Sequence, residues 1–320
     1  MAGVLLFFGE LCGTLAPMTI IGSRKISYAI SGTLVVLSFL SLAVWGLKPG
    51  IDFTGGSLLE VAFESERPEN EKISTALLKA GIDHVVVQPT GEKGVIMRFK
   101  PVDEKSHQDA IGALKKLGAL EERRFDSIGP TIGQELRRNS IWAIAIVLIM
   151  IVIYIAWAFR STQTVGSRHI SSWKYGITAI IALIHDVAIP TGVFAVLGHF
   201  YGVEVDTLFV TALLTILGFS VHDTIVVFDR IRENLKRLPN KNFEEVVEQS
   251  VRDTVTRSIN TSLTVLIVMI ALFVWGGVTT QFFSLAILIG VFFGVYSSIF
   301  VASALLVTWH RFSLRRTYLR

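Results

Sequence analysis

One apolar stretch, residues 207–228, constrains the fold of this chain more than any other part of its sequence. At about 1.5 Å per residue, a helix of this length crosses the roughly 30 Å hydrocarbon core of a bilayer. His222 and Asp223 nevertheless lie inside it. Asp223 is six residues before Asp229, about 9 Å along a helix, too deep for a short side chain to reach the interface. A carboxylate at that depth needs a partner, a proton or a water-filled cavity, so we expect it to be functional.

Five further apolar runs are long enough for transmembrane helices, and the mean hydropathy of +0.57 agrees with a membrane protein. These runs cover residues 27–47, 141–159, 176–197, 259–275 and 282–309. Lys and Arg cluster before the first run, after the second and after the last, which the positive-inside rule assigns to the cytoplasm. We therefore predict a polytopic α-helical membrane protein with six transmembrane helices and both termini cytoplasmic.

Between the first two runs the composition becomes strongly charged. Strand signals occur at residues 57–63, 84–89, 95–99 and 120–128, and helix signals at 68–80 and 103–117. Gly81 and Gly118 follow the two helices as stop signals. The βαββαβ order predicts an inserted ferredoxin-like α+β domain, which the topology places outside the cytoplasm.

The predicted domain order follows from these assignments. It comprises an N-terminal tail (residues 1–26), cytoplasmic or weakly membrane-associated and without assigned function, the first transmembrane helix (27–47), the extracytoplasmic domain (48–139), a five-helix membrane domain (140–310) and a basic cytoplasmic tail (311–320). Within the membrane domain, residues 229–257 alternate in charge sign and predict a cytoplasmic pair of helices, hinged at Pro239 and lying near the headgroups.

Polar side chains form stripes on the fourth and fifth predicted transmembrane helices. On the fourth the stripe consists of Thr207, Thr211, Thr215, Gly218 and His222, and on the fifth of Arg257, Asn260, Thr261 and Thr264. Such stripes turn toward other helices rather than toward lipid. An ion pair or water-bridged pair between Asp223 and Arg257 is geometrically reasonable. The alternative is that Arg257 extends to the headgroups as a topology anchor.

The third predicted helix carries a second buried His-Asp pair. Asp186 lies near its centre beside His185, and Pro190 leaves the carbonyl of Asp186 without its helical donor. Two such pairs could hold zinc or manganese only if they lay at the same depth, which the sequence does not show. Proton transfer along ionisable groups and water requires less, so we predict a proton pathway and no metal site.

The last predicted helix carries small residues at every fourth position. They are Gly290, Gly294, Ser298 and Ala302. This pattern is typical of close helix packing, more often within a chain than between chains.

Several function classes are disfavoured by composition. The single cysteine, Cys12, excludes an internal disulfide and a cysteine-based zinc site. The net charge of +4 reflects residues at helix ends, which argues against nucleic-acid binding. Neither a nucleophile-base arrangement nor a phosphate-binding loop is recognisable, so we predict neither an enzyme nor a bound cofactor.

Five sequence motifs, in order, resemble those of the SecF family. They are GIDFTGGSLLEV at residues 50–61, SIGPTIGQELRRNSIWA at 127–143, ALIHDV at 182–187, GFSVHDTIVVFDRIREN at 218–234 and RSINTS at 257–262. SecF is the smaller partner in the bacterial SecD/SecF protein-export complex and belongs to the resistance-nodulation-division superfamily. The resemblance extends from about residue 24 to the C-terminus.

This resemblance implies a function and partners. It implies a multi-pass protein of the bacterial inner membrane that uses the proton gradient to assist late steps of preprotein translocation. The implied partners are SecD in a heterodimer, the SecYEG translocon, YajC and an unfolded preprotein. Asp223 and Arg257 occupy the positions of the family's proton-coupling pair, and we place His222, Asp186, His185, Thr215, Asn260 and Thr264 along the pathway.

Two other classes of function remain open at this point. A half-transporter for lipids or small molecules would share the transmembrane helices, although such proteins usually carry two large external domains and twelve helices in one chain. A translocon scaffold that does not use the gradient would tolerate loss of Asp223. The sequence does not distinguish H⁺ from Na⁺ as the coupling ion.

Overall fold

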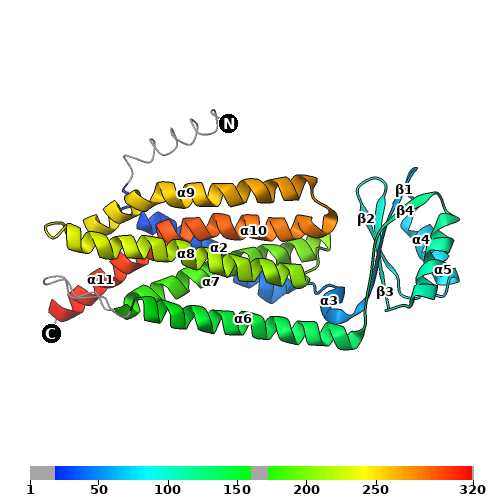
Figure 1. Ribbon diagram of the computed structural model, residues 1–320, viewed down its shortest axis with the longest axis horizontal. Helices are drawn as coiled ribbons and strands as arrows, with labels where there is room; N and C mark the ends of the chain where they lie inside the picture. Colours follow the sequence, from blue (N-terminus) through cyan, green and yellow to red (C-terminus); the bar gives the residue numbers. More distant parts are fainter. Residues whose placement is uncertain (1–18, 160–171, 319–320) are drawn as a thin grey trace. The chain divides into compact units, whose positions relative to one another are not determined.

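The computed structural model describes residues 19–159 and 172–318, which divide into two compact units (Figure 1). One unit comprises Lys48–Ala143 together with Glu204–Thr207, and the other contains the remaining described residues. Residues 1–17 lie outside the described residues, and so do Arg160 and Arg168, which belong to the basic cluster after the second apolar run.

Six helices of the described residues are long and apolar enough to cross a membrane, which confirms the predicted number. Five are α2 (Arg24–Trp45), α6 (Pro130–Ala158), α7 (Ser172–Tyr201), α8 (Thr207–Arg237) and α9 (Phe243–Trp275). The sixth combines α10 (Val278–Tyr296), a π-helical turn η1 (Ser297–Ala302) and α11 (Ser303–Tyr318).

Several helices extend beyond their predicted ends. The second begins at Pro130 rather than at residue 141, because proline has a suitable φ for the first helical position and the polar residues that follow are compatible with a helix. Residues 229–257 break near Pro239 as expected, but they prolong α8 and α9 instead of forming a separate helix pair. Asn242 begins α9 with a capping box in which its side chain accepts from Glu245 N–H at 2.9 Å.

Burial divides the transmembrane helices into central and peripheral ones. In α7, α8 and the sixth helix, 50–56% of the apolar stretch is buried, against 6% in α6 and 11% in α9. A ring cluster of Phe159, Tyr175 and Phe228 joins α7 and α8 to the end of α6, with centroids 5.2–5.8 Å apart. The membrane core is therefore formed around α7, α8 and the sixth helix.

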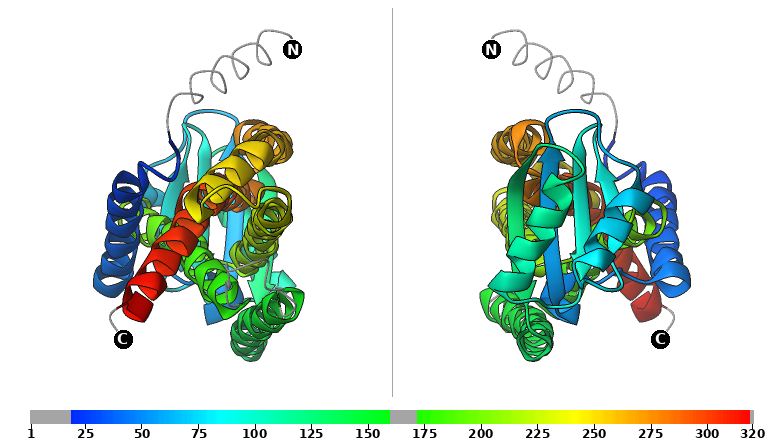
Figure 2. Two further views of the ribbon diagram at one scale, coloured as in Figure 1. Left: turned by 90° about the vertical axis from the view of Figure 1, so that its left-hand side faces the viewer. Right: turned by 90° about the vertical axis from the view of Figure 1, so that its right-hand side faces the viewer.

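The unit of residues 48–143 and 204–207, here called the extracytoplasmic unit after the location predicted for it, has the predicted βαββαβ order. Its elements are the short helix α3 (Ile51–Thr54), β1 (Gly56–Phe63), α4 (Asn70–Lys79), β2 (Val86–Thr90), β3 (Gly94–Phe99), α5 (Glu104–Lys115) and β4 (Leu120–Ile128). The antiparallel sheet has the order β2-β3-β1-β4, and α4 and α5 cover one of its faces (Figure 2). This is the ferredoxin-like arrangement expected from the sequence.

The core of this unit forms between the sheet and its two helices. Leu59 and Val61 of β1 and Met97 of β3 are fully buried against Leu77 of α4 and Leu114 of α5. At the start of α5, the Asp103 carboxylate accepts from Ser106 N–H at 3.0 Å, and this bond lowers the pKa of Asp103. A regular core and a capped helix thus make the unit a defined α+β domain.

Candidate functional site

The centre of the membrane unit holds a buried carboxylate with three side-chain donors. Asp186 of α7 is fully buried, and its Oδ1 lies 2.8 Å from His185 Nδ1. Its Oδ2 accepts hydrogen bonds from Ser220 of α8 and from Ser297 of η1, the latter at 2.7 Å. Three helical segments therefore converge on this carboxylate. Its cluster of donors satisfies a group that would be costly to bury alone.

The π-helical turn positions two consecutive serines in this region. Ser297 donates to Asp186, and Ser298 forms a hydrogen bond of 2.8 Å with Thr224, the neighbour of Asp223. Both serines are fully buried. Because π-helical turns occur frequently at functional sites, this turn agrees with a functional assignment for the polar centre.

Asp223 is buried on α8 and has a donor on α9. Ser258 Oγ donates to Asp223 Oδ1 at 2.5 Å. Oδ2 is buried and makes no well-formed hydrogen bond within the described part of the chain, although Ser298 is close to this carboxyl. A carboxyl group with one oxygen held and the other open is suited to bind a proton or a water molecule.

The structure does not bring Arg257 to Asp223. Arg257 is exposed on α9, and the adjacent Ser258 occupies the position facing Asp223. His222, Thr215, Asn260 and Thr264 are also exposed. The polar stripes of α8 and α9 therefore lie on the surface of this single chain, and the other helices that we expect them to face are not part of this chain.

The buried groups form a sequence of short steps between the two aspartates. His185 contacts Asp186, and Asp186 accepts from Ser297. The next residue, Ser298, contacts Thr224, which adjoins Asp223. His185 Nε2, like Asp223 Oδ2, is buried without a hydrogen-bond partner among the described residues. Proton transfer through a membrane core requires a series of hydroxyl and imidazole groups with an open acceptor or donor at each end. His185 Nε2 and Asp223 Oδ2 are such open groups.

The small residues of the sixth helix lie where it closely approaches α8. A Cβ atom added at Gly290 would lie 2.3 Å from Ile216 Cδ1, and one at Gly294 would lie 3.4 Å from Ser220 Cβ and 3.8 Å from Asp186 Oδ2. This close approach allows Ser220, Ser297 and Asp186 to meet. The two glycines thus lie beside the polar centre.

Sequence reasoning did not identify Ser220, Ser297, Thr224 or Ser258 as parts of the site. Serine and threonine in transmembrane helices commonly hydrogen-bond within their own helix, so their presence alone carried little information. The adjacent serines 297 and 298 in an apolar helix were the available signal.

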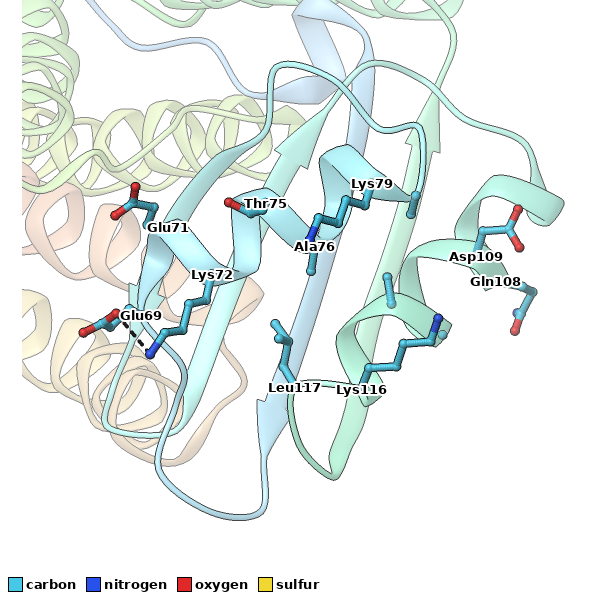
Figure 3. Close-up of a pocket in the computed structure, with 13 residues that line it drawn as sticks. Glu69, Glu71, Lys72, Thr75, Ala76, Lys79, Gln108, Asp109, Lys116 and Leu117 are labelled. Carbon is cyan, nitrogen blue, oxygen red and sulfur yellow. Dashed lines mark ion pairs between the residues drawn. The ribbon is translucent and has the colours of Figure 1, made fainter.

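A second feature, a groove of about 970 Å³, lies in the extracytoplasmic unit between α4 and α5 (Figure 3). Ala76 and Gly112 contribute to its lining, and Lys72, Lys79 and Lys116 line it together with Glu69, Glu71 and Asp109. Lys72 forms an ion pair of 3.3 Å with Glu69. Because positive and negative side chains are balanced and the groove is open, we interpret it as a solvated contact between two helices. It points to no particular class of ligand.

Residues 19–159 and 172–318 contain no group of three or more His, Cys, Asp or Glu side chains arranged to hold a metal ion. His185 and Asp186 are adjacent and hydrogen-bonded to each other. His222 is exposed, whereas Asp223 is buried. The two His-Asp pairs thus have different surroundings.

Comparison with known proteins identifies related sequences over most of the chain. Residues 109–312 match the family described as protein export membrane protein SecD/SecF, C-terminal, and residues 40–66 match the SecD/SecF GG motif. Protein translocase subunit SecF of Thermobaculum terrenum is 44% identical, covering 93% of this chain and 95% of the relative. The same subunit of Anaerolinea thermophila is 37% identical, covering 95% and 97%.

Solved structures agree with this relationship. The crystal structure of SecDF, a translocon-associated membrane protein from Thermus thermophilus, superposes with a TM-score of 0.78 at 32% identity over 92% of this chain. SecDF in its super-membrane-facing form gives a TM-score of 0.67 at 31% identity. This chain spans about two fifths of those chains, 39% and 40% respectively.

Proposed function

The chain belongs to the SecF family of protein-export membrane proteins, and from this membership we propose that it converts the proton gradient into assistance for preprotein translocation. In this proposal it acts in the bacterial plasma membrane with both termini in the cytoplasm, pairs with SecD and serves the SecYEG translocon, with YajC as a further partner. The substrate is an unfolded preprotein. No cofactor is required; the coupling ion in this proposal is H⁺, and Na⁺ is the alternative that the experiment below distinguishes.

The observation that supports proton coupling is the environment of Asp223. Its carboxyl group is buried in the membrane unit, and only Oδ1 has a well-formed hydrogen bond, from Ser258. Burying an isolated carboxylate costs free energy. When its surroundings change, Asp223 therefore gains or releases a proton, or gains or loses a charged partner. Asp186, with three side-chain donors, is by contrast positioned as a fixed member of the pathway.

A rotation of α9 provides a second state for Asp223. Successive residues on a helix are separated by about 100°. Ser258 faces Asp223 in this structure, so a rotation of about 100° would bring the preceding residue, Arg257, to the same place. We assign the arrangement with Ser258 to protonated Asp223 and the arrangement with Arg257 to the carboxylate. The two protonation states of Asp223 favour different arrangements. If their free energies for these arrangements differ by about 5.5 kcal/mol, the population inverts from 1:99 to 99:1.

The exposed polar stripes support a membrane partner. Thr215 and His222 on α8, and Asn260 and Thr264 on α9, are exposed although both helices are otherwise apolar enough to cross a bilayer. Polar groups facing lipid are unfavourable, so a second protein or an aqueous cavity between two proteins covers them. In our proposal this partner is SecD, and the proton pathway runs along α8 at the contact.

The substitution Asp223→Asn tests the proposed coupling. Asparagine preserves the shape of the side chain but carries no exchangeable charge, so we expect insertion to be normal and gradient-dependent secretion to be lost. Secretion and proton flux would be measured in vesicles that contain the complex. Asp229→Asn on the same helix is the control, because Asp229 is 74% exposed.

Normal gradient-dependent secretion by the Asp223→Asn variant would favour a scaffold that does not use the gradient. Repeating the measurement with a Na⁺ gradient in place of the H⁺ gradient would identify the ion. The half-transporter alternative receives no support from the relatives found, which are named as translocase subunits.

A further inference from the structure

The connection between α7 and α8 pairs with the start of the extracytoplasmic unit. Gly50 N–H donates to the Val205 carbonyl at 2.8 Å, and Val205 N–H donates to the Lys48 carbonyl at 2.8 Å. Pro49 and Val205 accordingly form a parallel β-bridge. Residues 204–207 are thus part of this unit, although the sequence analysis assigned residues 140–310 to the membrane domain.

Charged side chains reinforce this pairing. Arg98 Nε of β3 lies 2.8 Å from Glu204 Oε2, and Lys48 Nζ lies 3.8 Å from Glu204 Oε1. Burial raises the pKa of the Glu204 carboxyl, and the two cations act in the opposite direction. The ion pair connects the central part of the sheet to the residues immediately before α8.

Asp52 provides the final contact, at the first residue of α8. Its Oδ2 accepts a hydrogen bond of 3.0 Å from Thr207 N–H and another from Thr207 Oγ1. The first amides of a helix have no partner within the helix, and their partial positive charge favours a carboxylate. Asp52 therefore caps α8 from a separate element, α3.

The short helix α3 also contacts the start of α6. Gly55 ends α3 with φ of +73°, and a Cβ at Gly55 would lie 2.9 Å from Pro130 Cα. A Cβ at Gly133 would lie 2.8 Å from Gly55 N and 3.5 Å from the Asp52 carbonyl oxygen. Because α3 packs this tightly against α6, Asp52 has little freedom to move separately from the rest of the unit.

We propose that Asp52 is a positioning residue that couples the extracytoplasmic unit to α8, so that the unit and the Asp223 helix move together. Asp223 follows Thr207 by 16 residues, about 24 Å along a helix without an interruption. A displacement of the first turn of α8 is therefore carried to Asp223. This inference rests on the proposed proton coupling and adds a mechanical link to it.

The test uses the full chain in its membrane complex. Asp52→Ala removes the acceptor, Asp52→Asn retains an oxygen that can accept from Thr207 N–H, and Asp83→Ala removes an exposed carboxylate of the same unit as a control. A fourth variant replaces Asp52 and Thr207 with cysteines, so that a disulfide restores the link covalently. Native Cys12 is replaced by serine in all of them.

In the Asp52→Ala variant we expect gradient-dependent secretion to fall to the level measured without a gradient, while proton flux continues. Hydrogen exchange of the Thr207 amide should accelerate by about ten-fold, which corresponds to a decrease of about 1.4 kcal/mol in the free energy of local opening. Asp52→Asn should retain part of the secretion. Oxidation of the cysteine pair should restore secretion, and reduction should remove it again.

Two results would overturn the inference. One is secretion by Asp52→Ala equal to that of Asp83→Ala. The other is a loss that the oxidised cysteine pair does not restore, because a general folding defect would behave in this way. Asp223→Asn is measured in parallel. If Asp223→Asn abolishes secretion and Asp52→Ala does not, only the mechanical link is wrong, whereas normal secretion by Asp223→Asn contradicts the proposed function itself.

Discussion

Asp186 is stabilised by residues that are distant in sequence. Ser220 and Ser297, which donate to its Oδ2, are 34 and 111 residues away. Its neighbour His185 supplies the remaining contact. The polar centre is therefore completed only when α7, α8 and the sixth helix pack together. A donor removed from any one of them weakens the packing of all three.

Replacement of Ser297 by alanine should destabilise the protein through this carboxylate. The change removes one of two donors to Asp186 Oδ2, and the loss of a hydrogen bond to a buried polar group costs about 1–3 kcal/mol. Thermal unfolding of the purified chain would measure it. Ser303→Ala is a matched control, because Ser303 is also buried but donates to the carbonyl of Ile299 in its own helix. Equal destabilisation by both changes would contradict the assigned role.

Individual residues show both the success and the limit of sequence reasoning. The depth of Asp223 and Asp186 predicted that both are buried, and both are. The partner of Asp223 could not be predicted reliably, because Arg257 and Ser258 are adjacent and a rotation of about 100° exchanges them. Hydropathy does not determine the rotation of a helix about its axis. The pairing of Asp223 with Arg257 stays a prediction for another conformation.

At the scale of elements, the contact between α8 and the sixth helix depends on Gly290. Gly290→Ala would place a methyl group 2.3–2.8 Å from three side-chain atoms of Ile216, and overpacking of this kind costs about 1–3 kcal/mol. Ile216→Ala in the same chain should recover part of the loss, as a double-mutant cycle of unfolding free energies would measure. Gly32→Ala on α2 meets open space and should be nearly neutral. Additive effects of the two substitutions would argue against the close approach.

Element type was easier to predict than element ends. The six apolar runs and the βαββαβ order follow from periodicity and composition, and both are present. The early start of α6 and the π-helical turn in the sixth helix were missed. Polar residues continue α6 beyond the apolar run, and the π-turn depends on serines whose partners are on other helices. Pairing of residues 204–207 with residues 48–50 was missed for the same reason, since a short link does not reveal its distant contacts.

At the scale of the whole molecule, the surface of the membrane unit distinguishes two kinds of exposed helix face. From residue 141 onward, the exposed residues of α6 are mainly large and apolar, including Ile149 and Trp157, as expected for contact with lipid. The exposed faces of α8 and of the first part of α9 include Thr215, His222 and Asn260, whereas the end of α9 exposes apolar residues such as Ile267 and Val268. We therefore expect lipid next to the apolar face of α6 and another protein next to the polar faces of α8 and α9.

Cysteines introduced at Thr215 and Asn260 should form crosslinks with SecD in the intact complex, whereas a cysteine at Ile149 should not. The Cys12→Ser background avoids reaction at the native thiol. Crosslinked products would be identified by mass spectrometry. The expected partner surface would be wrong if Ile149→Cys crosslinked as efficiently as Thr215→Cys, or if a lipid-soluble thiol reagent labelled positions 215 and 149 equally in the complex.

The polar faces of α8 and α9 also bear on the biosynthesis of the chain. A copy inserted without its partner would present threonine, asparagine and histidine side chains to acyl chains, which is unfavourable for each group. Water or a membrane-embedded protease would have access to the same face. If SecD covers this surface, as we propose, a newly made copy becomes stable only when it meets SecD, and we expect copies made in excess of SecD to be lost first.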